Sequence, residues 1–101
     1  MRIFKIRYFA RWMRKTELTD AHLITAAEEM AKGLIDADLG GGVVKKRIAI
    51  GNRGKSKGVR TLVGTNKGSR WFFLFGFEKN ELDNISENTL LGLQESAHDL
   101  L

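Results

Sequence analysis

The fold is decided by residues 43–80, VVKKRIAIGNRGKSKGVRTLVGTNKGSRWFFLFGFEKN. Three segments of this stretch have the alternation or the apolar content of β-strands, namely Val43–Ile50, Val59–Thr65 and Arg70–Phe77. The last is almost entirely apolar, as expected of a central strand that is covered on both faces. The loop Gly51–Gly58 and the turn Asn66–Ser69 join the strands into a predicted antiparallel meander, and Gly68 is expected to supply the positive φ of the turn.

The same stretch is strongly basic. Between Leu39 and Phe77 the chain has no acidic residue. It has nine basic residues there: Lys45, Lys46, Arg47, Arg53, Lys55, Lys57, Arg60, Lys67 and Arg70. Residues 1–15 add six bases and no acid, whereas 17–38 and 78–101 each hold six acids and one base. Charge that is segregated in this way predicts a positive face that binds a polyanion. Nucleic acid fits better than an anionic membrane, because no segment has the pattern of a basic amphipathic helix.

The segments on either side of the meander predict a small α+β domain over residues 1–101, in which helices pack on an antiparallel sheet. Residues 2–7 alternate between polar and apolar side chains, which indicates a short strand. A short helix is expected near residues 8–15. The predicted order of elements is therefore β-α-α-β-β-β-α.

Capping residues mark the two longer helices. Thr19 is a suitable N-cap for the first, and Gly33 is expected to end it. Its apolar residues recur at helical spacing as far as Leu34, and this face should pack on the sheet. Residues 36–42, DADLGGG, predict a turn. Ser86 is a suitable N-cap for the last helix.

Several classes of protein are not supported by the sequence. The chain has no cysteine, which excludes disulfides, thiolate metal sites and a cysteine nucleophile. Its two histidines, His22 and His98, lie on different predicted helices without a ligand-spaced companion, so neither a metal nor another cofactor is expected. No apolar run approaches the roughly 18 residues of a membrane span, and the N-terminus does not have the pattern of a signal peptide. We therefore expect a cytoplasmic protein.

Candidate catalytic residues gather where the second strand of the meander begins, after Lys55 and Lys57, and where the third strand ends. Antiparallel pairing can bring Arg60 close to the end of the third strand, where Glu78, Lys79 and Glu81 follow. Fixed positive charge can stabilise the phosphorane that forms when RNA is cleaved. The RNA brings its own 2′-OH nucleophile, so the protein has only to supply a general base and acid, for which Glu78, Glu81 and Lys79 are candidates. The alternative is that the acids only begin a helix and the bases only bind nucleic acid.

Aromatic side chains can either stack on nucleobases or fill the core. Core packing is the simpler interpretation for most of the aromatic residues in the strands. Tyr8 and Trp71 lie nearest to the ends of their segments, so they are the better candidates for exposed rings.

Two motifs resemble the RelE/ParE superfamily of bacterial toxins, and most closely its HigB-like branch. The first is GKSKGVR at 54–60. The second is FEKNE at 77–81, followed by NIS at 84–86. The segments FARW, LTD and DADLGGGVVKKR extend the resemblance over nearly the whole chain.

This resemblance implies a RelE-like fold and a toxin that binds the ribosomal A site, cleaves mRNA without a metal and thereby inhibits translation. It also implies a cognate antitoxin that neutralises the toxin. Arg60 is expected to stabilise the phosphorane, while Lys55 and Lys79 engage phosphate and assist proton transfer. The other bases of the meander are then candidates for RNA binding: Lys45, Lys46, Arg47, Arg53, Lys57, Lys67 and Arg70. A ParE-like inhibitor of DNA gyrase, or a member that binds RNA or protein without catalysis, would have the same fold.

Overall fold

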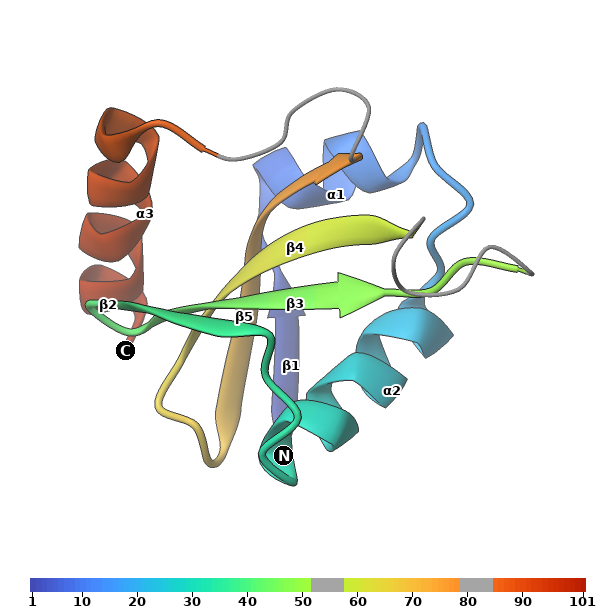
Figure 1. The fold of residues 1–101 in the computed structure, drawn as a ribbon, viewed down its shortest axis with the longest axis horizontal. Helices are drawn as coiled ribbons and strands as arrows, with labels where there is room; N and C mark the ends of the chain where they lie inside the picture. The colour runs from blue at the N-terminus through green and yellow to red at the C-terminus, as the bar shows by residue number, and fades with distance from the viewer. Residues whose placement is uncertain (52–57, 79–84) are drawn as a thin grey trace.

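The computed structural model describes residues 1–51, 58–78 and 85–101, which form a mixed sheet with helices on both faces (Figure 1). The strands are β1 (Arg2–Lys5), β2 (Ala37–Gly40), β3 (Val43–Ile48), β4 (Val59–Thr65) and β5 (Arg70–Glu78). The helices are α1 (Arg7–Met13), α2 (Asp20–Ala31) and α3 (Glu87–Leu100). The predicted α+β class is confirmed, and β2 is an additional strand in the predicted order.

The strands lie in the order β1-β5-β4-β3-β2. The predicted meander is confirmed, because β3 pairs antiparallel with β4 and β4 pairs antiparallel with β5. However, β1 runs parallel to β5, so the sheet is mixed and not purely antiparallel as predicted. β5 lies between β1 and β4, which explains its apolar sequence: most of its residues are buried.

The segment 36–42 is more than the turn that its glycines indicate. Ala37–Gly40 forms β2 and pairs antiparallel with β3. The turn itself is made by Gly41 and Gly42, whose φ angles of 61° and 83° favour glycine. In the next tight turn, between β4 and β5, the positive φ of 62° belongs to Lys67 and not to the predicted Gly68.

The predicted helix caps are confirmed. The Thr19 hydroxyl accepts a hydrogen bond from the backbone N–H of His22, and the Ser86 hydroxyl accepts one from Thr89. Gly33, with a φ of 94°, follows the C-cap of α2. Leu34, predicted to lie on the apolar face of this helix, comes after the helix has ended and is exposed.

Each face of the sheet has its own apolar core. α1 and α2 cover one face, where Phe9, Leu23 and Phe73 belong to the larger cluster. α3 packs on the other face over Val43, Leu62 and Leu74, among others. In α3, which is described along its whole length, Ala97 is the one buried residue. It fits against Gly64, where a Cβ would lie 3.1 Å from the Ala97 methyl group.

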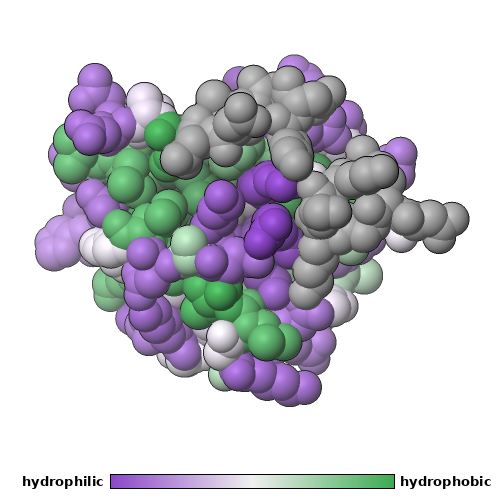
Figure 2. Space-filling model, viewed as in Figure 1, coloured by the Kyte–Doolittle hydropathy of each residue, from purple (hydrophilic) through white to green (hydrophobic). Residues whose placement is uncertain are grey.

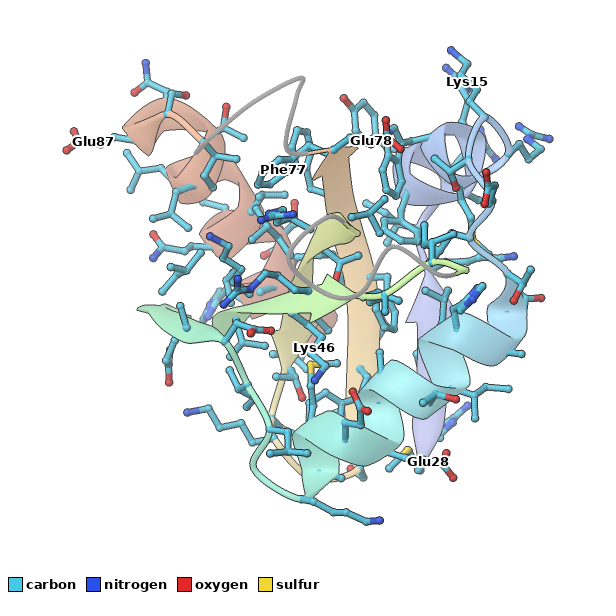
Figure 3. The ribbon with its side chains drawn as sticks, turned by 45° about the vertical axis from the view of Figure 1, so that its right-hand side comes forward. Lys15, Glu28, Lys46, Phe77, Glu78 and Glu87 are labelled. Carbon is cyan, nitrogen blue, oxygen red and sulfur yellow. The ribbon has the colours of Figure 1, made fainter. Side chains whose placement is uncertain are left out.

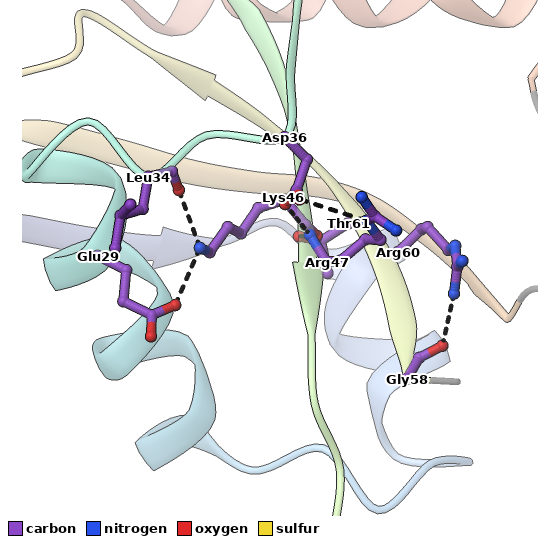
Figure 4. A network of polar contacts seen from close by, with 8 residues as sticks. All are labelled: Glu29, Leu34, Asp36, Lys46, Arg47, Gly58, Arg60 and Thr61. Atoms are coloured by element: carbon purple, nitrogen blue, oxygen red, sulfur yellow. Dashed lines mark hydrogen bonds and ion pairs between the residues drawn. The ribbon is translucent and has the colours of Figure 1, made fainter. Parts of the chain in front are cut away.

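A buried charge connects α2 to β3. The Lys46 side chain is only 2% exposed, and its Nζ lies 2.9 Å from both Glu29 Oε1 and the Leu34 carbonyl oxygen (Figure 4). Lys46 points to this side because successive residues of a strand face opposite sides of a sheet. The ammonium is therefore neutralised within the fold, between the end of α2 and the sheet.

Glu29→Gln is expected to lower the free energy of unfolding by about 1–3 kcal/mol, because the Lys46 ammonium stays buried while its carboxylate partner is lost. Glu28→Gln is the matched control, since Glu28 is exposed on the same helix (Figure 3). That variant should stay within about 0.5 kcal/mol of the original protein. Urea denaturation measures both, and equal losses would contradict a specific role of Glu29.

Candidate functional site

A bulge in β5 decides which aromatic side chains share a face with Arg60. Leu62 pairs with Phe75 while Val63 pairs with Phe73, so Leu74 is the extra residue of the bulged strand. The shift turns Phe75 and Phe77 to the face that α3 partly covers. Without the bulge, period-two alternation would place them on the opposite face.

Arg60 is held at the end of this face. It pairs with Phe77 of β5 and with Arg47 of β3, so the predicted approach to the end of β5 is confirmed. Its side chain is largely buried, and Nη1 donates a hydrogen bond of 3.0 Å to the Gly58 carbonyl oxygen (Figure 4). The guanidinium therefore has a fixed position at the point where β4 begins.

Two further predicted RNA-binding residues share the Arg60 face. Lys45 and Arg47 alternate with the buried Lys46 along β3, so they point to the opposite side from it. Arg47 Nε lies 3.3 Å from Asp36 Oδ1, and its backbone N–H donates to Oδ2 of the same carboxylate. Figure 2 shows a hydrophilic strip over β3, bordered by apolar surface toward α3.

The remaining described candidates lie elsewhere. Lys46 is in the interior, so the structure does not place it on the surface with Lys45 and Arg47. Lys67 lies in the β4–β5 turn and Arg70 directly follows it, at the opposite end of β4 from Arg60. Arg70 Nη2 donates to the Leu101 carbonyl oxygen at 3.3 Å.

Lys67 has an acidic neighbour of its own. Its ammonium forms an ion pair with Asp38 of β2. This hydrogen-bonded ammonium, together with the Gly40 backbone N–H, lowers the pKa of the Asp38 carboxyl below its ordinary value. Part of the Lys67 charge is therefore offset locally by a carboxylate.

The acid/base candidates are only partly placed. Glu78 pairs with Val59 at the end of β5, so strand alternation puts it on the other face from Arg60 and Phe77. Figure 3 shows it beside α1. Five predicted site residues lie outside the described residues: Arg53, Lys55, Lys57, Lys79 and Glu81.

Tyr8 extends the aromatic surface beyond the sheet. Its ring stacks on Phe75 with centroids 5.7 Å apart and an interplanar angle of 9°, and the residue is 59% exposed. The expectation of an exposed ring is confirmed for Tyr8 but wrong for Trp71, which is fully buried. The contribution of Phe75 to this surface was not predicted, although Gly76, an isolated glycine inside the strand pattern, is the kind of residue that often marks a bulge.

The family model for the RelE toxin of the RelE/RelB toxin–antitoxin system matches residues 1–101. The chain belongs to the RelE toxin family. It is therefore a toxin of a toxin–antitoxin system, and the resemblance to the RelE/ParE superfamily is confirmed. Its placement in the HigB-like branch stays a prediction. A search of curated proteins finds no match to this RelE-family toxin.

Two further properties of the toxin concern the described part of the chain. No helix there is long and apolar enough to cross a membrane. Within the same residues, no three His, Asp or Glu side chains gather closely enough to hold a metal ion. The face that carries Arg60 offers a guanidinium of fixed position, further positive charge and aromatic rings.

Proposed function

We propose that this RelE-family toxin is an endoribonuclease that cleaves mRNA on the ribosome and thereby inhibits translation. The observation that supports the proposal best is the position of Arg60. Its guanidinium is held by the Gly58 carbonyl group on a face that also carries Arg47 and the rings of Phe75 and Phe77. Such a face offers charge to a phosphodiester and apolar surface to the adjoining bases.

The proposed reaction uses the 2′-OH of the RNA as nucleophile. Its oxygen attacks the adjacent phosphorus, the bond to the 5′ oxygen breaks, and the products are a 2′,3′-cyclic phosphate and a 5′-OH. Arg60 stabilises the phosphorane, because a fixed positive charge acts where negative charge develops. Lys55 and Lys79 engage the phosphate and assist proton transfer, and Glu81 is the candidate acid or base, since Glu78 faces away from Arg60.

Positive charge around this centre binds the rest of the RNA. Lys45 and Arg47 share the face of Arg60 and contact phosphates of the same strand. Arg53 and Lys57 belong to the same basic segment of sequence. Lys67 and Arg70 lie at the far end of β4 and contact more distant RNA, including that of the ribosome.

The family also implies a partner. We propose that the cognate antitoxin neutralises the toxin by laying an acidic segment, disordered on its own, over this positive face. Contact there would compete directly with RNA. The chain has a net charge of +5, which favours association with an acidic partner.

Inducible expression tests the proposed reaction. Ends of mRNA are mapped within minutes of induction, and new 5′-OH ends are expected inside coding regions. A reporter gene with an inactivated start codon is the matched control, because its transcript is made but not translated. Growth arrest with intact mRNA and broken DNA would contradict the proposal and favour a ParE-like action on gyrase.

A further inference from the structure

α1 carries a hollow with two kinds of side chain. Tyr8, Arg11, Trp12 and Lys15 line it, and its volume is about 160 Å³. Tyr8 and Trp12 are four residues apart, as are Arg11 and Lys15, so each pair projects from the same side of the helix and its C-terminal extension. The hollow therefore combines an aromatic pair with a basic pair.

Packing on β5 holds the two rings in place. Trp12 packs flat on β5 at Gly76, where a Cβ would lie 2.2 Å from its Cζ3 atom. Tyr8 rests on Phe75, with the two rings nearly parallel. More than half of Tyr8 nevertheless remains exposed. A ring that is fixed by packing and still open to solvent can stack on another flat group with little loss of entropy.

Among the residues that the structure describes, no ion pair neutralises this basic pair. Residues 1–15 contain no Asp or Glu. Within the described residues, neither Arg11 nor Lys15 forms an ion pair. Both side chains are exposed, and Lys15 projects outward beyond the end of α1 (Figure 3). Their charge is available to an anion in solution.

The hollow adjoins the face that carries Arg60. The Phe75 ring, on which Tyr8 stacks, contacts the Phe77 ring with centroids 6.1 Å apart. Phe77 in turn pairs with Arg60. Figure 3 shows Phe77 at the end of β5, between α3 and α1. An unbroken row of rings thus leads from the proposed cleavage centre to α1.

We propose that this hollow is a nucleotide subsite that takes one unpaired nucleotide of the mRNA beside the cleaved bond. The base stacks on Tyr8, and Arg11 and Lys15 bind the adjoining phosphate. The inference rests on the proposed function, since it places the substrate relative to Arg60. Single-stranded RNA fits because its bases can turn out and offer their faces. An acidic antitoxin segment would use the charges but not the open ring.

Binding of a non-cleavable RNA tests the aromatic half of the subsite. A fluorescein-labelled 2′-O-methyl RNA oligonucleotide cannot be cleaved, because it has no free 2′-OH, and fluorescence anisotropy reports its affinity. Tyr8→Ala is expected to weaken binding about 5- to 100-fold, whereas Tyr8→Phe keeps it within about twofold. Tyr8→Leu still covers Phe75 but has no π face, so it should bind as weakly as the alanine variant.

Salt dependence tests the basic half. For single strands, each phosphate contact contributes roughly 0.7 to the slope of log K against log salt concentration. Because Arg11 and Lys15 bind the same phosphate, the double variant Arg11→Ala, Lys15→Ala should reduce the slope by about 0.7. Arg14→Ala is the matched control, because Arg14 is exposed on the same segment but does not line the hollow. It should leave the slope nearly unchanged.

The possible outcomes separate the subsite from the proposed function. Circular dichroism first verifies that each variant is folded. If the Tyr8 and double variants bind RNA as the original protein does, while Arg60→Ala loses cleavage, the subsite is wrong and the endoribonuclease proposal stands. If the variants lose binding to the antitoxin but not to RNA, the hollow belongs to the antitoxin and the proposal is overturned. Unchanged cleavage in Arg60→Ala would instead count against the proposed function.

Discussion

Arg60→Ala is expected to abolish growth arrest and to lower the rate of mRNA cleavage at least about 10²- to 10³-fold. The loss is large because the guanidinium is fixed before the reaction begins. Its Nη1 already donates to the Gly58 carbonyl group, and the side chain is only 7% exposed. A preorganised cation of this kind stabilises the phosphorane without having to be oriented during the reaction.

Arg60→Lys separates charge from geometry. Lysine keeps the positive charge but has neither the planar fork nor the reach of the guanidinium, so most of the activity should still be lost. Arg47→Ala is the matched control, because Arg47 lies opposite Arg60 in the β3–β4 register but forms an ion pair with Asp36. A loss of about tenfold or less is expected there, as for one weakened phosphate contact.

Folding has to be measured beside activity, because Arg60 is buried. Thermal unfolding and binding of the cognate antitoxin report whether the variant keeps its structure. Folded Arg60→Ala that still cleaves mRNA at the original rate would contradict the proposed role. Folded protein with equal losses in Arg60→Ala and Arg47→Ala would indicate that the face binds RNA without a distinct catalytic centre.

The three strands of the meander were predictable from their alternating or apolar sequences, although β3 ends at Ile48 and not at the predicted Ile50. β4 has the predicted bounds, Val59–Thr65, since its side chains alternate and it follows glycine and precedes Asn66. Strand β2 was not predictable in the same way. Its four residues ADLG include two that are common in turns, and pairing with β3 overrides that local preference.

Only those positions of the candidate site that strand register determines were predictable from the sequence. Antiparallel pairing of the β4 and β5 backbones places Arg60 beside the end of β5, regardless of how the side chains pack. The bulge at Leu74 was not predicted, because Leu74 and Phe75 are both apolar and fit either face; Gly76 is the sequence signal that could have indicated it. Burial of Lys46 was equally hidden, since it depends on where Glu29 of the docked helix lies.

In the turn at 66–69, hydrogen bonds to a side chain put the positive φ on a residue other than glycine. Asn66 Oδ1 accepts backbone hydrogen bonds from Gly68, Ser69 and Arg70. These contacts define the turn around Asn66, and Lys67 then takes the positive φ. Sequence preferences alone favour Gly68 for that conformation. They do not include the hydrogen bonds to Asn66, which form only when the two strands are paired.

Gly58→Ala is expected to destabilise the protein by about 1–3 kcal/mol and to lower cleavage nearly as far as Arg60→Ala. A Cβ on residue 58 would lie 2.0 Å from the Ile48 carbonyl oxygen and 3.1 Å from Ala49 Cα. Both are backbone atoms, so the clash cannot be relieved by rotating a side chain. β3 and the start of β4 have to separate instead.

This separation acts on the candidate site because the Gly58 carbonyl group is the acceptor for Arg60 Nη1. Gly68→Ala is the matched control: it lies in an exposed turn, where the nearest atom to a Cβ would be 3.9 Å away. That variant should change stability by no more than about 0.5 kcal/mol and leave cleavage intact. Urea denaturation and mRNA end mapping measure the two effects. If Gly58→Ala keeps full stability and full cleavage, the carbonyl contact does not position the guanidinium. If the variant is still folded but has lost cleavage, catalysis depends on that contact.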